Sequence, residues 1–145
     1  MRYTYEMLKS MTTEYGDSFY VLNVGRFTAN YQELLAAFRA QYPKTEIAYS
    51  YKTNYIPALC RVVNALGGYA EVVSHMEYAL ARRVGVPYEK IVFNGPYKQP
   101  EAVRELLLGG GTVHLDCLQE LELVQEVARE NPDSRLRVGI RVNFP

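Results

Sequence analysis

Ile47–Asn54, with the sequence IAYSYKTN, brings an apolar stretch to an end on a single lysine, Lys52, where a helix is expected to begin. Because strand side chains alternate between the two faces of a sheet, Lys52 shares its face with Ala48 and Ser50, and the bulky residues point the other way. We predict that the bulky face packs on helices and that the small face lines a cavity. Lys52 would enter that cavity from the carboxyl end of a parallel strand, where α/β proteins carry their chemistry.

A lysine in that position can serve as a nucleophile. Burial disfavours the charged form of an amine, so a partly buried Lys52 would present a neutral amine that condenses with an aldehyde to form a Schiff base. The simpler interpretation is that Lys52 is a solvated head group on an apolar stem, which is the common state of an isolated lysine at a strand end.

The rest of the chain alternates short apolar runs with amphipathic segments. The expected strands are Phe19–Asn23, the stretch that ends at Lys52, Ala70–Val73, Ile91–Phe93, Val113–Leu115 and Leu136–Val142. The expected helices are Ala29–Gln41 and the segments near 54–66, 74–84, 100–107 and 118–129. From Lys52 onward the strand ends recur about every 20 to 27 residues, which is typical of repeated strand–helix–strand units with right-handed crossovers.

This alternation predicts an α/β fold with a parallel sheet. A closed eight-stranded barrel of the TIM type needs about 250 residues, so this chain supplies only about five barrel strands of an incomplete barrel. Residues 1–17 are predicted to form an N-terminal arm, and residues 18–145 the first part of the barrel. The two open sheet edges would be completed by a longer chain or by another copy. A doubly wound nucleotide-binding domain is the alternative fold, but no Gly-x-Gly-x-x-Gly or Walker loop follows an expected strand.

Composition argues against several classes of function. The 16 basic and 16 acidic side chains give a formal net charge of zero and are spread through the chain, so no basic face for nucleic acid or an anionic membrane is expected. The sequence has no apolar run of about 20 residues and no cleavable leader, so we predict a cytoplasmic protein without a membrane partner. Cys60 and Cys117 are isolated, so neither a metal site nor a disulfide framework is predicted.

Tyr49–Asn54, YSYKTN, resembles the Tyr-Ala-x-Lys-Ala-Asn motif of the pyridoxal-phosphate-dependent amino-acid decarboxylases built on the alanine racemase-type barrel. This family includes the ornithine, diaminopimelate and carboxynorspermidine decarboxylases. Four later segments are similar to family motifs and occur in the same order, namely Gly68–Glu77, Asn94–Gln99, Asp116–Leu121 and Ile140–Asn143. Several motifs in register behind a lysine motif are a specific signal, and the resemblance covers about residues 18–143.

The resemblance implies roles for three residues. Lys52 would be the catalytic residue that binds pyridoxal 5'-phosphate as a Schiff base and later acts as acid or base near the substrate's α-carbon. Glu71 occupies the family's acidic position, where it would hydrogen-bond to the lysine amine. Arg141 occupies the position of an arginine near the cofactor's ring oxygen or phosphate. An ordinary ion pair with a carboxylate on the strand face is an equally weighted interpretation of Arg141.

Other residues of these segments have simpler structural interpretations. Glu77 has the spacing of a capping box with the serine three residues before it. Asn94, Lys98 and Asp116 are interpreted as turn and capping residues. Cys117 occupies the family's serine position at a strand-to-helix turn and is not expected to be a catalytic thiol.

The resemblance implies a carboxy-lyase that binds a small amino acid and releases its α-carboxylate as carbon dioxide. The full-length form would be a homodimer with a C-terminal β-domain. That domain and the later cofactor-binding segments are absent from this chain, so the 145 residues alone are not expected to decarboxylate. A pyridoxal-phosphate-dependent racemase or single-domain carrier of the same barrel, and a non-catalytic paralogue that acts by association, are the alternatives.

Overall fold

Five short parallel strands form one sheet, and their order in space follows their order in the chain. The computed structural model describes residues 3–142 and residue 144. The strands are β1 (Ala48–Ser50), β2 (Tyr69–Val72), β3 (Ile91–Phe93), β4 (Thr112–Leu115) and β5 (Arg137–Ile140). A doubly wound sheet reverses direction at a switch point, whereas here each strand is added beside the preceding one, as in a barrel wall. The predicted parallel (β/α) barrel, incomplete in this chain, is therefore confirmed.

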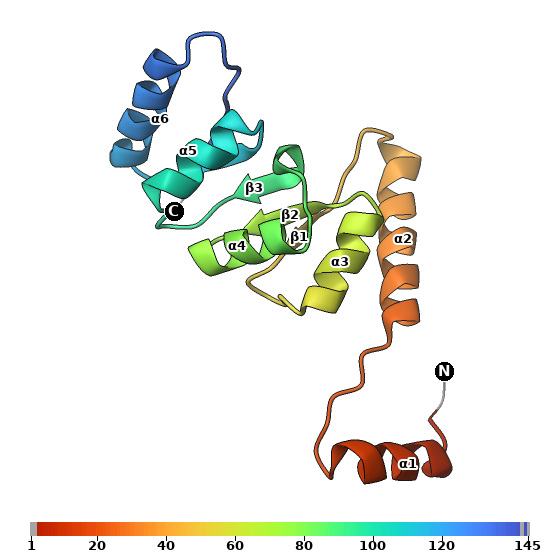
Figure 1. Ribbon diagram of the computed structural model, residues 1–145. Helices are drawn as coiled ribbons and strands as arrows, with labels where there is room; N and C mark the ends of the chain where they lie inside the picture. Colours follow the sequence, from red (N-terminus) through yellow and green to blue (C-terminus); the bar gives the residue numbers. More distant parts are fainter. Residues whose placement is uncertain (1–2, 143, 145) are drawn as a thin grey trace.

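Helices connect the strands and cover one face of the sheet (Figure 1). The first, α1 (Tyr5–Tyr15), has no buried residue and stands apart from the sheet in Figure 1. The others are α2 (Val24–Gln41), α3 (Pro57–Ala65), α4 (His75–Arg83), α5 (Pro100–Leu108) and α6 (Leu118–Glu130), with a short 3-10 turn, η1 (Tyr88–Lys90), before β3. None of the helices in the described residues is long and apolar enough to cross a bilayer.

Strand register separates a core face from a polar face. Ala70 pairs with Ile91 and Val72 with Phe93, and all four side chains are buried under the helices. The residues between them alternate to the opposite face, so Glu71 of β2 lies there with its partner Ser50 of β1. The apolar side of each strand thus fixes which polar side chains face the interior of the barrel.

The N-terminal region differs from prediction. Phe19–Asn23 is not a strand; it leads in extended form to α2, which starts at Val24 rather than near Ala29. The physical reason is local, because the Asn23 Oδ1 accepts a hydrogen bond of 2.8 Å from the Arg26 amide and so caps a helix at the next residue. Tyr20 in this run is fully exposed, so its apolar side chain has no sheet to pack on.

Two helices begin with related capping arrangements. At α4, the N-cap Ser74 Oγ accepts from the Glu77 amide at 3.3 Å, which confirms the first hydrogen bond of the predicted capping box. The Glu77 Oε2 accepts at 2.9 Å from the amide of Val73, the residue before the N-cap, rather than from the Ser74 amide. At α6, the Glu120 Oε2 accepts from the Asp116 amide at 2.8 Å, but the N-cap residue Cys117 forms no side-chain hydrogen bond. The second helix therefore has the carboxylate hydrogen bond of this arrangement but lacks the N-cap side-chain hydrogen bond.

Replacing Cys117 with serine is expected to raise the free energy of unfolding by about 0.5–1 kcal/mol, because a hydroxyl can accept the hydrogen bond that the thiol does not. Urea denaturation of the two proteins measures the change. The matched variant Ser74→Cys should lower the free energy of unfolding by a similar amount, because it removes the hydroxyl that accepts from the Glu77 amide. If Cys117→Ser is neutral or destabilising while Ser74→Cys is destabilising, the equivalence of the two helix starts is wrong.

Candidate functional site

The carboxyl ends of the five strands surround one hollow of about 590 Å³. Each strand contributes a residue just beyond its end: Lys52 after β1, Val73 after β2, Asn94 after β3, Asp116 after β4 and Arg141 after β5. Gly95 and Pro96 complete the lining. This is the end of a parallel sheet where α/β proteins bind ligands, because the loops there can vary without disturbing the core. We call this feature the strand-end hollow.

Lys52 is held by the turn that follows β1. The Thr53 hydroxyl donates to the Ser50 carbonyl at 2.8 Å and closes the turn, while the Tyr51 side chain is 1% exposed and packs in the core. Burial raises the pKa of the Tyr51 hydroxyl, which therefore stays uncharged. The predicted alternation is confirmed, since Tyr51 points under the helices and Lys52 lines the strand-end hollow.

The expected burial of Lys52 is not observed. Its side chain is exposed, because β1 is an edge strand of the described sheet and leaves one side of the strand-end hollow open. The described residues therefore leave the Lys52 side chain in contact with solvent.

Glu71 faces the interior of the barrel but contacts other partners than expected. The Ser50 hydroxyl donates to Glu71 Oε2 at 2.5 Å, and the Asn94 Nδ2 donates to Glu71 Oε1 at 3.3 Å. Among the described residues no hydrogen bond joins Glu71 to Lys52. The strand register explains this, because Ser50 lies directly opposite Glu71 and Lys52 lies two residues further on, about 6.6 Å along the strand. Ser50 and Asn94 hold the carboxylate in place.

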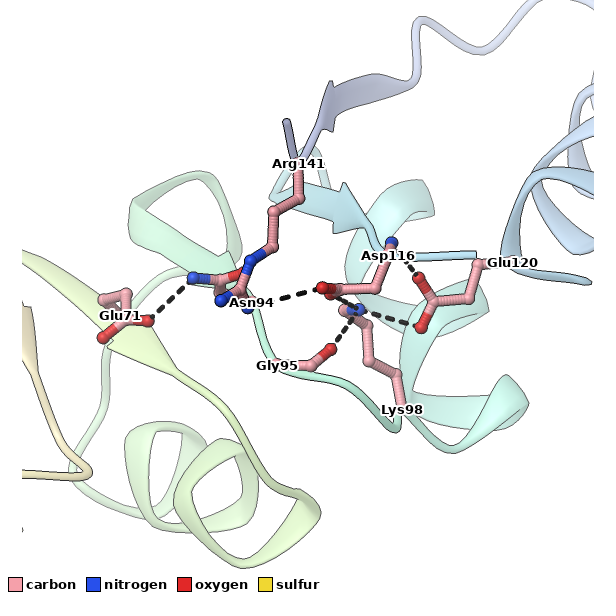
Figure 2. A network of polar contacts seen from close by, with 7 residues as sticks. All are labelled: Glu71, Asn94, Gly95, Lys98, Asp116, Glu120 and Arg141. Carbon is pink, nitrogen blue, oxygen red and sulfur yellow. Dashed lines mark hydrogen bonds and ion pairs between the residues drawn. The ribbon is translucent and has the colours of Figure 1, made fainter. Parts of the chain in front are cut away.

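A buried ion cluster lies behind the strand-end hollow (Figure 2). The Lys98 side chain is 0% exposed, and its ammonium donates to the Gly95 carbonyl at 2.6 Å, to Glu120 Oε1 at 2.8 Å and to Asp116 Oδ2 at 3.1 Å. All three donors of the ammonium are thus used. The interpretation of Lys98 and Asp116 as turn and capping residues is incomplete, because they also form this buried cluster.

The predicted ion pair of Arg141 with a carboxylate is observed, and its predicted role near the cofactor stays a prediction. Its Nη1 lies 3.4 Å from Asp116 Oδ1, so it pairs with a carboxylate, and it also lines the strand-end hollow. The side chain is 55% exposed, and an exposed pair at this distance contributes little to stability. A loosely held guanidinium at the edge of a hollow remains available to an anionic ligand.

Gly95 brings the loop after β3 against the end of β2. Its φ is +102°, and a Cβ at this position would lie 2.5 Å from the Val73 carbonyl oxygen. Only glycine fits, because a side chain would be strained by the backbone conformation and would clash with the backbone of β2. This close approach puts the Gly95 carbonyl within reach of Lys98.

Gly95→Ala is expected to lower the free energy of unfolding by about 2–4 kcal/mol, the sum of left-handed strain and a backbone clash. Gly110→Ala is the matched control, since Gly110 has a φ of +86° but open space around a Cβ. It should cost only about 1 kcal/mol. Chemical denaturation of both variants separates the two contributions, and equal losses would show that the clash with Val73 is relieved.

Comparison with known proteins identifies the family. Residues 28–144 match the family described as "Pyridoxal-dependent decarboxylase, pyridoxal binding domain". The chain belongs to this family. It is 30% identical over 142 residues to the diaminopimelate decarboxylase of Aquifex aeolicus, an alignment that covers 94% of this chain and 31% of that protein. It also resembles antizyme inhibitor 1 of Pongo abelii, with 32% identity over 92 residues that cover 63% of this chain and 20% of that protein.

Solved structures of family members share the fold. The crystal structure of diaminopimelate decarboxylase from Methanocaldococcus jannaschii in complex with L-lysine superposes with a TM-score of 0.79 and 31% sequence identity, over 91% of this chain and 31% of that one. The chain therefore spans about a third of the length of the relatives that it matches.

The residues of the strand-end hollow fit pyridoxal phosphate, the cofactor of this family. The cofactor carries an aldehyde, an anionic phosphate and polar ring atoms. Lys52 offers an amine for the aldehyde and Arg141 a cation for an anionic oxygen. The Asn94 Oδ1 is buried without a hydrogen-bond partner among the described residues, so it can accept a hydrogen bond from a ligand. No group of three metal-ligating side chains occurs in the described part of the chain.

Proposed function

We propose that this chain forms the cofactor-binding part of a pyridoxal-phosphate-dependent amino-acid decarboxylase, with Lys52 as the residue that binds the cofactor. The observation that carries this proposal is the position of Lys52: it lies beyond the carboxyl end of β1, in the one hollow to which all five described strands contribute, in a chain of the pyridoxal-binding family. Chemistry at the carboxyl ends of parallel strands supports the same assignment.

Three side chains would have separate roles in binding the cofactor and in the reaction. Lys52 would bind the cofactor's aldehyde and, once the amino acid has taken its place, hold or deliver a proton near the substrate's α-carbon. Glu71, fixed by Ser50 and Asn94, would place a negative charge on the interior face beside the cofactor. Arg141 would bind an anionic oxygen. When bound, pyridoxal phosphate supplies the electron sink for the bond that loses carbon dioxide.

The names of the relatives suggest which amino-acid substrate to test first. Diaminopimelate decarboxylases of five organisms match more than nine-tenths of this chain, so meso-diaminopimelate is the first amino acid to test. We further propose that residues 18–145 form the first part of a closed barrel, with residues 1–17 as an arm and a β-domain supplied outside these residues. A cytoplasmic homodimer is the proposed form of the whole enzyme.

A chimera tests the proposed activity. Residues 28–144 replace the matching segment of the Aquifex aeolicus diaminopimelate decarboxylase, and release of carbon dioxide from carboxyl-labelled meso-diaminopimelate is measured with pyridoxal phosphate present. We expect release that is lost in the Lys52→Ala chimera and kept in the Lys44→Ala chimera. A folded chimera that binds the cofactor at Lys52 but releases no carbon dioxide would contradict the decarboxylase assignment.

The same chimera distinguishes a decarboxylase from a racemase and from a non-catalytic member of the family. Inversion at an α-carbon without loss of carbon dioxide would indicate a racemase. A non-catalytic member is the second candidate function, and it is favoured by the similarity of this chain to a protein named as an inhibitor. That candidate predicts a folded protein in which pyridoxal phosphate leaves Lys52 unmodified.

A further inference from the structure

Lys98 is a buried cation that the proposed function does not use. Its ammonium has two carboxylates, Asp116 and Glu120, within 3.1 Å, and the three side chains come from the β3–α5 loop, the end of β4 and the first turn of α6. A buried lysine with excellent geometry still costs desolvation, and an apolar residue of similar size would often be equally stable here. Stability alone therefore does not explain why a lysine is buried at this position.

Asp116 connects this cluster to the proposed cofactor site. Its Oδ2 accepts from Lys98 at 3.1 Å while its Oδ1 lies 3.4 Å from the Arg141 Nη1, so one carboxylate bridges two cations (Figure 2). Asp116 is 15% exposed and Arg141 is 55% exposed, so the bridge runs from the buried cluster to the edge of the strand-end hollow.

The net charge of the cluster influences whether Arg141 can bind an anionic ligand. Lys98 and Arg141 are formally positive and Asp116 and Glu120 formally negative, so the four side chains sum to zero. Without Lys98 the sum becomes negative, and Asp116 would have Arg141 as its remaining cation within reach. The guanidinium would then be drawn to Asp116 and would be less available to an anion in the strand-end hollow.

We propose that Lys98 is a positioning residue that neutralises Asp116 and Glu120 and so leaves Arg141 available to the anionic group of the cofactor. This inference rests on the proposed function. Lys98 does not touch the ligand; it acts through Asp116. It also donates to the Gly95 carbonyl, which ties the loop that lines the strand-end hollow to the same cluster.

The test is the apparent dissociation constant of pyridoxal 5'-phosphate, measured by visible absorbance on the 145-residue chain. Lys98→Met is expected to weaken binding about tenfold, a change that corresponds to about 1.4 kcal/mol. Asp116→Asn should bind as tightly as the parent chain or more tightly, because it frees Arg141. The double variant Lys98→Met/Asp116→Asn should return to within about threefold of the parent, because it lacks the carboxylate that would draw Arg141 away. Glu120, the other partner of Lys98, forms no ion pair with Arg141 in the described residues.

The matched control is Lys90→Met. Lys90 donates to the Gly67 carbonyl near the start of β2, at the opposite end of the sheet, and its loss should leave cofactor binding unchanged. A purely structural role of Lys98 predicts that the double variant binds as weakly as Lys98→Met and that Asp116→Asn also weakens binding. Either result overturns the inference. If Lys98→Met does not fold, the Asp116→Asn variant decides alone. Unchanged or tighter cofactor binding then supports the inference, and weaker binding overturns it.

Failure of the proposed function gives a different pattern. In that case the visible absorbance of pyridoxal 5'-phosphate does not change when it is mixed with the parent chain. Titration of the same variants with inorganic phosphate, followed through the NMR signal of the Arg141 side chain, then measures the anion site without the lysine chemistry. Weaker phosphate binding in Lys98→Met that Asp116→Asn restores supports the inference. Equal phosphate binding in all variants, or none in the parent chain, overturns it.

Discussion

Replacing Lys52 with alanine is expected to abolish the visible absorbance change that pyridoxal 5'-phosphate causes in this chain and to weaken the apparent affinity at least about tenfold. The physical reason is that the other lysines are poorly placed. Lys98 has every ammonium proton bonded inside the buried cluster, and Lys90 is bonded to the Gly67 carbonyl. Of the chain's lysines, Lys52 is the one that lines the strand-end hollow.

Lys44→Ala is the control for this result. Lys44 is exposed in the segment before β1, so pyridoxal 5'-phosphate can reach its amine as it can reach that of Lys52. Lys44 does not line the strand-end hollow, so its replacement should not change the titration. An unchanged titration in Lys52→Ala, or a loss in Lys44→Ala of similar size, would show that the cofactor reacts with exposed amines in general.

Phe93→Ala is expected to lower the free energy of unfolding by about 3–5 kcal/mol. Phe93 is 0% exposed and its ring stacks on Tyr78 of α4 with 5.7 Å between centroids, so truncation leaves a cavity between β3 and the helix layer. Because Asn94 follows directly, the loss of packing should also loosen the hydrogen bond from Asn94 to Glu71.

Chemical denaturation with Phe38→Ala as control measures this effect. Phe38 on α2 is 56% exposed, so its truncation should change stability by no more than about 0.5 kcal/mol. Comparable losses for the two variants would mean that the sheet-to-helix core does not carry the stability of the chain.

The strand–helix alternation could be predicted from sequence because each strand has one apolar face. β2, β3 and β4 lie within a residue or two of the expected runs, since residues such as Val72, Phe93 and Val113 must all face the helices. The capping box at Ser74 was equally predictable, because it depends only on residues three apart. The position of Lys52 followed from the same alternation together with the family resemblance.

Features that depend on distant contacts could not be predicted in this way. The apolar run at Phe19–Asn23 resembles a strand, and a short run without a partner strand cannot be distinguished from an extended linker by periodicity. The Lys98 cluster joins residues that lie 18 and 22 positions apart. Lysine burial gives no local signal, and the role of Glu120 was missed for the same reason. The resemblance of Asp116–Leu121 to a family motif was the available clue.

The most direct test of the account is the site at which the cofactor becomes fixed. The chain is incubated with pyridoxal 5'-phosphate, reduced with borohydride, digested and analysed by mass spectrometry, and the modified fraction of each lysine is measured. We expect the added mass predominantly on Lys52, with a modified fraction well above that of the exposed Lys9 and Lys44. Modification that follows exposure alone, or that leaves Lys52 unmodified, would contradict it.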